Sequence, residues 1–282
     1  MGYEHAEKVR TLQGKLSCAA KQSLDRRFGA LYDKIYREDV LWTAWRRVKA
    51  NRGAPGVDRQ SIRHIEREIG VGVFLTELGE ELRKQRYRPL PVRRCWIDKP
   101  GKPGEKRPLG IPVIRDRVCQ MATKLVIEPI FEANFLPCSY GFRPGRSAHM
   151  AIDRIRRSIT FEGQTAVIDA DIRGYFDNIR QDILLRLVQR RISDPRVVKL
   201  IGSWLRAGVM EDGELTKPDG LGTPQGGVIS PLLANIYLHS FDVMFARAQI
   251  PGTLVRYADD VVILTRGNGT QVLGQVRRML AR

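Results

Sequence analysis

The sequence predicts a mixed fold of helices and strands, of the α/β or α+β class, from two kinds of pattern. Apolar residues recur at three- and four-residue steps in several long segments, which is typical of amphipathic helices. Shorter segments alternate apolar and polar residues, as half-buried strands do, and the clearest is 165–172, TAVIDADI. Because 43% of the 282 residues are hydrophobic, the chain can bury a substantial core.

Two helical stretches are expected before residue 83, on either side of a turn. The turn is 51–58, NRGAPGVD, with two glycines and a proline in eight residues. Residues 61–82 follow as a helix. The first fifty residues are expected to be helical because they carry an apolar stripe, formed by Leu24, Phe28, Leu31, Ile35, Trp42 and Trp45.

The next segment, 83–107, is strongly basic, with ten Lys and Arg residues opposed only by Asp98 and Glu105. Its end, 99–107 (KPGKPGEKR), is a Gly/Pro loop between short extended runs and predicts the tip of a β-hairpin. A basic, flexible tip can clamp phosphates, and Arg93 and Arg94 are candidates for nucleic-acid contacts. A solvated run of charge explains the pattern equally well.

The remaining elements alternate between helix and strand. Helices are expected at 116–131, 147–159, 180–191 and 270–282, and loops at Pro195 and over 208–222. Ser230-Pro231 predicts a helix start, since a hydroxyl cap followed by proline suits the first turn. Strands at 254–257 and 261–264 predict a hairpin with acids at its turn.

The charge balance points to a polyanionic partner. Lys and Arg number 48 against 31 Asp and Glu, a net charge of +17 with a pI near 10.2. Nucleic acid is the simplest partner for such a chain. The alternative is a basic protein whose surface charges are only solvated.

Several protein classes can be excluded from the sequence. No apolar run approaches the ~18 residues of a membrane span. The four cysteines show no C-x-x-C spacing, so neither a zinc ribbon nor a disulfide scaffold is expected. No targeting segment is evident, and the expected location is cytoplasmic, away from membranes.

Two acidic positions stand out as candidate chemistry. Asp171 lies at the end of a strand-like run, and Asp259-Asp260 lie in the predicted hairpin turn. Carboxylates brought together at strand ends suit Mg²⁺, which takes one or two carboxylates with water and substrate phosphates. Two such ions about 3.5–4 Å apart can support phosphoryl transfer. An Asp-rich turn is the alternative for the hairpin acids alone.

Six ordered blocks give the chain a specific resemblance. The blocks are 53–58 (GAPGVD), 107–120 (RPLGIPVIRDRVCQ), 139–147 (SYGFRPGRS), 171–179 (DIRGYFDNI), 222–239 (GTPQGGVISPLLANIYLH) and 256–263 (RYADDVVI). Together they resemble the group II intron-encoded reverse transcriptases, also called intron maturases.

The resemblance implies the fingers and part of the palm of a right-hand polymerase, with an antiparallel palm sheet and packed helices. It implies a helical N-terminal extension over 1–75, fingers over 76–164 and palm over 165–282, with the reverse transcriptase domain at about 83–282. The thumb that follows in the family is absent, which suggests a fragment or a truncated copy.

It also implies roles for individual residues. Asp171, Asp259 and Asp260 would be the catalytic carboxylates and hold two Mg²⁺ ions, with Asp169 a neighbour. Lys99, or Lys102 in its place, would grip the triphosphate with Arg107. Tyr175 or Phe176 would be the aromatic gate that excludes a 2′-hydroxyl, and Gln225 and Gly226 would form the floor of the nucleotide pocket. Arg143 would either contact the template or pair with an acid.

The function implied is RNA-directed DNA synthesis from dNTPs on an RNA template and DNA primer, with intron RNA as a further partner of the intact protein. Two alternatives remain open. One is an RNA-binding splicing cofactor or inactive copy without polymerase activity. The other is a reverse transcriptase of a retron, diversity-generating or phage-defence system.

Overall fold

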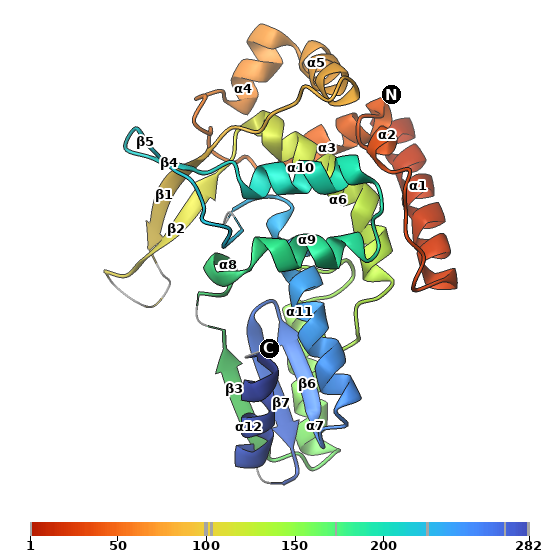
Figure 1. The fold of residues 1–282 in the computed structure, drawn as a ribbon, viewed down its shortest axis with the longest axis vertical. Helices are drawn as coiled ribbons and strands as arrows, with labels where there is room; N and C mark the ends of the chain where they lie inside the picture. Colours follow the sequence, from red (N-terminus) through yellow and green to blue (C-terminus); the bar gives the residue numbers. More distant parts are fainter. Residues whose placement is uncertain are drawn as a thin grey trace. The chain divides into compact units, whose positions relative to one another are not determined.

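The computed structural model describes residues 2–98, 101, 104–172, 174–223, 226–267 and 269–280. The chain forms two compact units (Figure 1). The helical unit comprises Met1–Ala133 and Phe176–Ser230, and the sheet unit comprises Asn134–Tyr175 and Pro231–Arg282. Each unit is therefore built from two separate segments of the chain.

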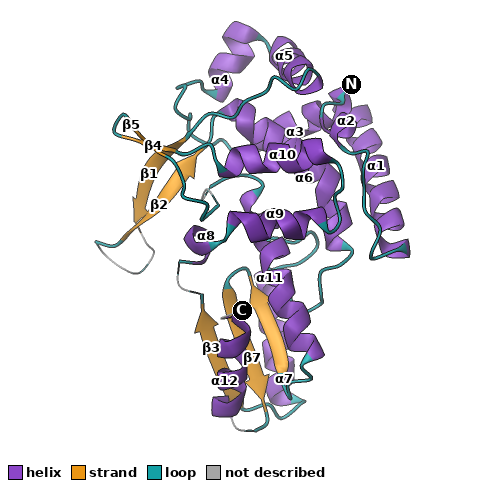
Figure 2. Cartoon of the chain, viewed as in Figure 1, coloured by secondary structure: helices purple, strands orange, loops and turns teal. Residues whose placement is uncertain are grey.

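Helices form most of the helical unit (Figure 2), and α6 is its centre. Almost all side chains of α6 are buried because it packs against both α1 and α3. The helices are α1 Gly2–Gln22, α2 Tyr32–Ile35, α3 Glu38–Ala50, α4 Ile62–His64, a π-helix at Ile65–Ile69, α5 Val71–Arg83, α6 Ile114–Glu132, α8 Tyr175–Asn178, α9 Gln181–Gln189 and α10 Pro195–Leu205.

A four-stranded sheet completes this unit. Strands β1 Val92–Asp98 and β2 Lys106–Ile111 pair antiparallel, which confirms the hairpin predicted around 99–107. Strands β4 Val209–Glu211 and β5 Glu214–Thr216 continue the sheet in the order β2-β1-β4-β5. The loop predicted over 208–222 is therefore wrong in part, because Val209 finds a parallel partner in Val92, far away in sequence.

Three helix boundaries also differ from the prediction. Phe28 is not helical, since its N–H donates to the Arg191 carbonyl and its own carbonyl accepts from Ser193. The helix expected over 61–82 is interrupted at Gly70, whose φ is 83°. Pro195 is the first residue of a helix rather than part of a loop, with the Asp194 side chain capping it.

The sheet unit contains three antiparallel strands in the order β3-β7-β6. Its strands are β3 Ala166–Asp171, β6 Thr253–Tyr257 and β7 Asp260–Thr265, and its helices are α7 Ala148–Thr160, α11 Ser230–Arg247 and α12 Gly269–Leu280. These elements confirm the predicted strand at 165–172, the hairpin around Asp259-Asp260 and the helix beginning at Ser230-Pro231.

The two faces of this sheet are covered by different helices. One face packs against α11 and α12 through Phe241, Phe245, Val272 and Val276. The other face packs against α7 through Ala151 and Ile155. Alternation along β3 directs Asp169 and Asp171 to the α7 face, where they are exposed. In the part of the chain described, no helix is both long and apolar enough to cross a membrane.

A buried carboxyl joins several elements of the helical unit. Asp116 on α6 accepts a 2.5 Å hydrogen bond from the Tyr87 hydroxyl and a 3.0 Å bond from the Leu90 N–H. The Trp204 indole of α10 donates to the same hydroxyl at 2.9 Å. Burial raises the pKa of Asp116 to about 6, despite the bonds from Tyr87 and Leu90 that favour its ionised form.

This pKa predicts a pH-dependent loss of stability. A carboxyl with a raised folded-state pKa stabilises the fold below its unfolded pKa, and the contribution disappears as pH rises through about 6. Between pH 4 and 7, the free energy of unfolding of wild type should therefore fall by on the order of 2 kcal/mol relative to that of Asp116→Asn. Urea unfolding of both proteins at the two pH values measures this difference, and a pH-independent difference would contradict the prediction.

Candidate active site

Three carboxylates meet at one end of the β3-β7-β6 sheet. The β3–β7 register places Asp171 directly opposite Asp260, so their side chains share one face. Tyr257 of β6 and Asp260 of β7 are the last paired residues of these two strands. Asp259 lies next to Asp260, in the two-residue turn that connects the strands. Asp171 precedes Asp259 by 88 residues in the chain. The fold nevertheless makes Asp171, Asp259 and Asp260 neighbours within one unit.

The carboxylates influence one another electrostatically. Partial burial raises the pKa of Asp259, and repulsion from Asp171 raises it further. The pKa of Asp260 is raised by burial and then by Asp259, Asp171 and Asp169. A positive charge between these groups would relieve both effects, since it favours their ionised forms.

The donor chemistry suits a hard divalent cation. Carboxylate oxygens are the protein ligands that Mg²⁺ prefers, and Asp171 and Asp260 present them from paired strands. No group of three or more His, Cys, Asp or Glu side chains in the described ranges is placed to hold a metal ion by itself. A cation here would therefore take one or two carboxylates and complete its coordination with water or phosphate oxygens.

The turn that carries Asp259 has a strained backbone in tight surroundings. Ala258 has a φ of 58°, in the left-handed region that favours glycine. Gly141 packs against it so closely that a Cβ on Gly141 would lie 2.3 Å from the Ala258 nitrogen. Only glycine therefore allows the 139–147 segment to approach the turn.

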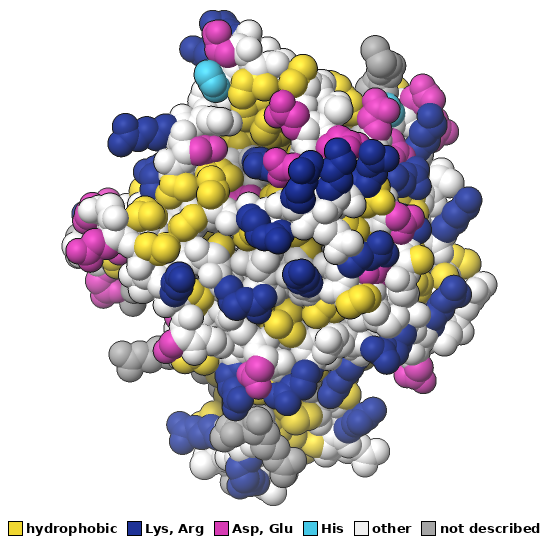
Figure 3. Space-filling view, turned by 45° about the horizontal axis from the view of Figure 1, so that its top comes forward, with side chains coloured by type: hydrophobic (Ala, Val, Ile, Leu, Met, Phe, Trp, Pro, Cys, Tyr) yellow, Lys and Arg dark blue, Asp and Glu magenta, His cyan; other side chains and the backbone are white. Residues whose placement is uncertain are grey.

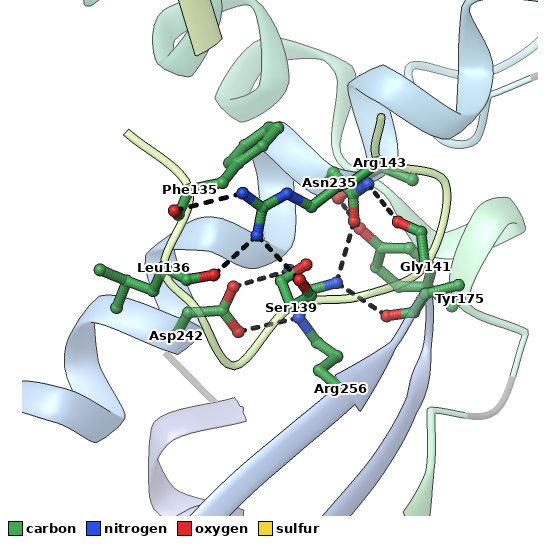
Figure 4. A network of polar contacts seen from close by, with 11 residues as sticks. Phe135, Leu136, Ser139, Gly141, Arg143, Tyr175, Asn235, Asp242 and Arg256 are labelled. Atoms are coloured by element: carbon green, nitrogen blue, oxygen red, sulfur yellow. Dashed lines mark hydrogen bonds and ion pairs between the residues drawn. The ribbon is translucent and has the colours of Figure 1, made fainter. Parts of the chain in front are cut away.

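A buried polar network lies next to this turn (Figure 4), and it was not predicted from the sequence. Its centre is Arg256 of β6, which is 0% exposed. The carboxylate of Asp242 on α11, also fully buried, pairs with the Arg256 guanidinium at 2.6 Å. The one sequence signal that could have indicated an internal ion pair is an arginine inside a predicted strand that is flanked by apolar residues.

Arg143 belongs to the same unit and is largely buried. It is 8% exposed, and its guanidinium donates to the carbonyls of Leu136 at 2.7 Å and Ser139 at 2.8 Å. The ring of Phe135 lies 5.3 Å from it. These donors hold the loop before α7, and a contact of Arg143 with nucleic acid stays a prediction.

The two aromatic residues after Asp171 differ in environment. Tyr175 is 6% exposed, and its hydroxyl donates to the Ala234 carbonyl of α11 at 2.7 Å. Phe176 is half-buried. Tyr175 thus helps to fix the segment that follows β3 to α11.

Of the residues predicted to contact the nucleotide from 99–107 and the PQGG motif, Arg107 and Gly226 are described. Arg107 is exposed on β2, whereas Lys99, Lys102 and Gln225 lie outside the described residues. Gly226 has a φ of 104°, and a Cβ there would lie 2.5 Å from the Gly110 carbonyl of β2. Gly226 therefore packs directly on β2, which a larger residue at 226 would prevent.

Arg93 and Arg94, the predicted nucleic-acid contacts on β1, are both partly engaged. The Arg93 guanidinium donates to the Pro55 carbonyl at 2.9 and 3.1 Å, and so ties the strand to the GAPGVD turn. Arg94 forms an ion pair with Glu211 at 3.5 Å and lies over the exposed Trp96 ring. The polar partners that Arg93 and Arg94 have in these contacts belong to the helical unit itself.

A cationic surface that the sequence did not indicate surrounds α10. Lys and Arg side chains gather across the middle of the face shown in Figure 3. Arg88, Arg196, Lys199 and Arg206 line a hollow of about 160 Å³, and we call these four residues the α10 face. Arg196 pairs with Asp194, but Lys199 and Arg206 form no ion pair within the described ranges. These two cations are therefore available to an external anion.

Comparison with known proteins identifies relatives of the whole chain. Residues 97–282 match the family model described as reverse transcriptase (RNA-dependent DNA polymerase). Protein YkfC of Escherichia coli K12 is 35% identical over 94% of this chain and 77% of its own length. The group II intron-encoded protein LtrA of Lactococcus lactis is 36% identical over 81% of this chain.

The other similarities cover more limited ground. The chain spans 37% of LtrA and 25% of a Schizosaccharomyces pombe 91 kDa protein in the cob intron, with 36% identity to each. Among solved structures, a chain of the partial Cas6-RT-Cas1–Cas2 complex matches with a TM-score of 0.50 and 24% identity. That match covers 89% of this chain and 42% of the other, and it supports the fold alone.

The mutual repulsion of the acids predicts stabilisation by divalent ions. Millimolar Mg²⁺ should raise the Tm of wild type by about 3 °C, because a ligand that binds the folded state stabilises it. Asp260→Asn should show a smaller rise and a slightly higher Tm without the ion. Thermal melts at constant ionic strength measure this, with Asp153→Asn on α7 as the control. Equal Mg²⁺ responses in the two variants would contradict the assignment.

Proposed function

The chain belongs to the reverse transcriptase (RNA-dependent DNA polymerase) family, and from that premise we propose that it carries the polymerase centre of a group II intron-encoded enzyme. The reaction is RNA-directed DNA synthesis from dNTPs on a primer–template. In the intact protein, the same chain would also bind its intron RNA and assist splicing. The observation that carries the proposal is the meeting of Asp171, Asp259 and Asp260 at one sheet end.

The carboxylates would act through bound divalent ions, which we propose to be two Mg²⁺. When bound there, such ions supply Lewis acidity at the primer 3′-hydroxyl and neutralise charge on the triphosphate. Asp171 and Asp259 are the proposed ligands, and Asp260 is a second acid that adds negative charge to the site. The protein contributes fixed carboxylate positions, so little reorganisation is needed when nucleotide arrives.

The finger hairpin would hold the incoming nucleotide. Arg107 presents a planar fork of donors suited to phosphate oxygens, and Lys99, or Lys102, adds a point charge. Gln225 and Gly226 would form the floor of the nucleotide pocket. An aromatic side chain at Tyr175 or Phe176 would exclude a 2′-hydroxyl from the sugar position.

The α10 face offers a place for RNA backbone on the helical unit. Its three arginines and one lysine line a hollow, and their N–H groups are donors suited to phosphate oxygens. The net charge of +17 favours such binding over a purely solvated surface. We therefore propose that Lys199 and Arg206 contact phosphates of the bound RNA.

Loss of Asp259 should abolish synthesis. Primer extension on an RNA template should occur with wild type and fall by about 100-fold or more in Asp259→Ala, since the carboxylate positions the charge that the transition state requires. Asp153→Ala removes an exposed carboxylate from the same unit and should extend normally. Extension that persists in Asp259→Ala would refute the catalytic assignment. RNA binding by a wild type that never extends primers would leave a splicing cofactor as the function.

Neutralising the α10 face should weaken RNA binding and its dependence on salt. The double variant Lys199→Gln, Arg206→Gln removes two phosphate contacts, so the slope of log affinity against log salt should fall by about two. The control is Lys8→Gln, Lys34→Gln, which removes the same charge from lysines already paired with Glu4 and Asp33. Equal slopes in both variants, measured by filter binding, would show that the α10 face does not bind RNA.

A further inference from the structure

We propose that Arg256 is a positioning residue for the active site, and this inference rests on the proposed function. Its side chain reaches no substrate, because it is fully buried in the sheet unit. It acts through the backbone of the Ala258–Asp259 turn, which presents the Asp259 carboxylate. The inference follows from how the guanidinium is bonded, how the turn is strained and how the two are connected.

Every donor of the Arg256 guanidinium has a partner (Figure 4). The two nitrogens that face Asp242 donate to its carboxylate at 2.8 and 2.6 Å. The remaining N–H groups donate to the Ser139 hydroxyl at 2.9 Å, the Asn235 side-chain oxygen at 3.0 Å and the Ala258 carbonyl at 2.9 Å. A guanidinium has five N–H donors and all five are used, whereas a lysine at 256 would supply only three.

One of these bonds holds the turn directly. The Ala258 carbonyl belongs to the peptide group that leads into Asp259, so its orientation sets the direction in which the chain enters the acid. Ala258 adopts a φ of 58°, which costs an L-residue free energy and persists only where the surroundings impose it. The Arg256 bond to this carbonyl is such a constraint.

A second connection reaches the same turn from the other side. The Asn235 amide accepts from Arg256 and donates to the Gly141 carbonyl at 2.8 Å. Gly141 in turn abuts the Ala258 nitrogen. Arg256, Asn235, Gly141 and Ala258 therefore form a closed ring of contacts around the base of the turn.

The effect of Arg256 on Asp259 is geometric more than electrostatic. Asp242 neutralises the guanidinium charge within the network. Among the influences on the Asp259 pKa, attraction by Arg256 is the weakest, behind burial and repulsion from Asp171. A positioning residue of this kind resembles the outer groups that orient metal ligands, whose loss costs about 10–100-fold in metal affinity or activity.

Arg256→Lys tests the inference because it retains a charge for Asp242 but cannot make all five bonds. We expect Mn²⁺ affinity, measured by EPR titration of the chain alone, to fall about tenfold, and kcat to fall similarly with the nucleotide KM little changed. The matched control is Arg191→Lys, which alters a buried arginine that donates to the Arg26 carbonyl of the helical unit. It should lose stability but keep Mn²⁺ affinity and kcat.

A second-site rescue separates positioning from stability. Ala258→Gly removes the backbone strain at φ 58° and should restore part of the Mn²⁺ affinity and kcat lost in Arg256→Lys. If Arg256→Lys fails to fold, Asn235→Ala opens the same ring while leaving the Arg256–Asp242 pair, and should cause a smaller loss in the same direction. Hydrogen exchange at the Asp259 and Asp260 amides should speed up in both variants.

The inference would be overturned if Arg256→Lys kept the Mn²⁺ affinity and amide exchange of wild type. It would also be overturned if Arg191→Lys lost as much as Arg256→Lys. These two measurements do not require polymerase activity. A wild type that extends no primer, in which Arg256→Lys still weakens Mn²⁺ binding and loosens the turn, would refute the proposed function and support the positioning role.

Discussion

A charged guanidinium without access to water lies at the centre of the sheet unit, and the rest of that unit is arranged around it. Moving Arg256 and Asp242 out of water is costly, and the cost is offset only if every donor is satisfied with good geometry. Those partners come from α11, from the segment before α7 and from the hairpin turn itself. These three pieces must therefore assemble together, since any one displaced would leave a buried polar group unpaired.

This requirement explains how the acidic site can exist at all. Asp259 and Asp260, together with Asp171, raise one another's free energy when ionised, and attraction by Arg256 offsets this repulsion only weakly at Asp259. A site of like charges opposes its own assembly, so the scaffold must hold it. The β3–β7 register supplies one constraint and the strained turn at Ala258 the other. Repulsion that is unfavourable in the free protein becomes affinity for a divalent cation.

Several arginines of the helical unit are likewise bonded within their own unit. Examples are Arg93 to the Pro55 carbonyl, Arg191 to main-chain carbonyls and Arg196 to Asp194. The excess charge of the chain is therefore not all available to a ligand. The positive charge that is available lies at particular exposed positions, among them Lys199 on α10, Arg206 directly after α10 and Arg107 on β2.

By itself, the sequence determined the elements whose signals are local and the residues that lie in ordered blocks. Alternation predicted β3, turn chemistry predicted both hairpins, and Ser230-Pro231 predicted α11. The family was readable in the same way, and its motifs point to Asp171, Asp259 and Asp260 as the proposed catalytic acids. Only the tertiary structure decided features set by distant partners. Phe28 forms a β-bridge with Ile192 instead of the helix that its apolar spacing predicts, and Arg143 donates to carbonyls of its own loop. The side-chain partners of Arg256 come from residues 14 to 117 positions away, because burial satisfies polar groups wherever the fold brings donors and acceptors together.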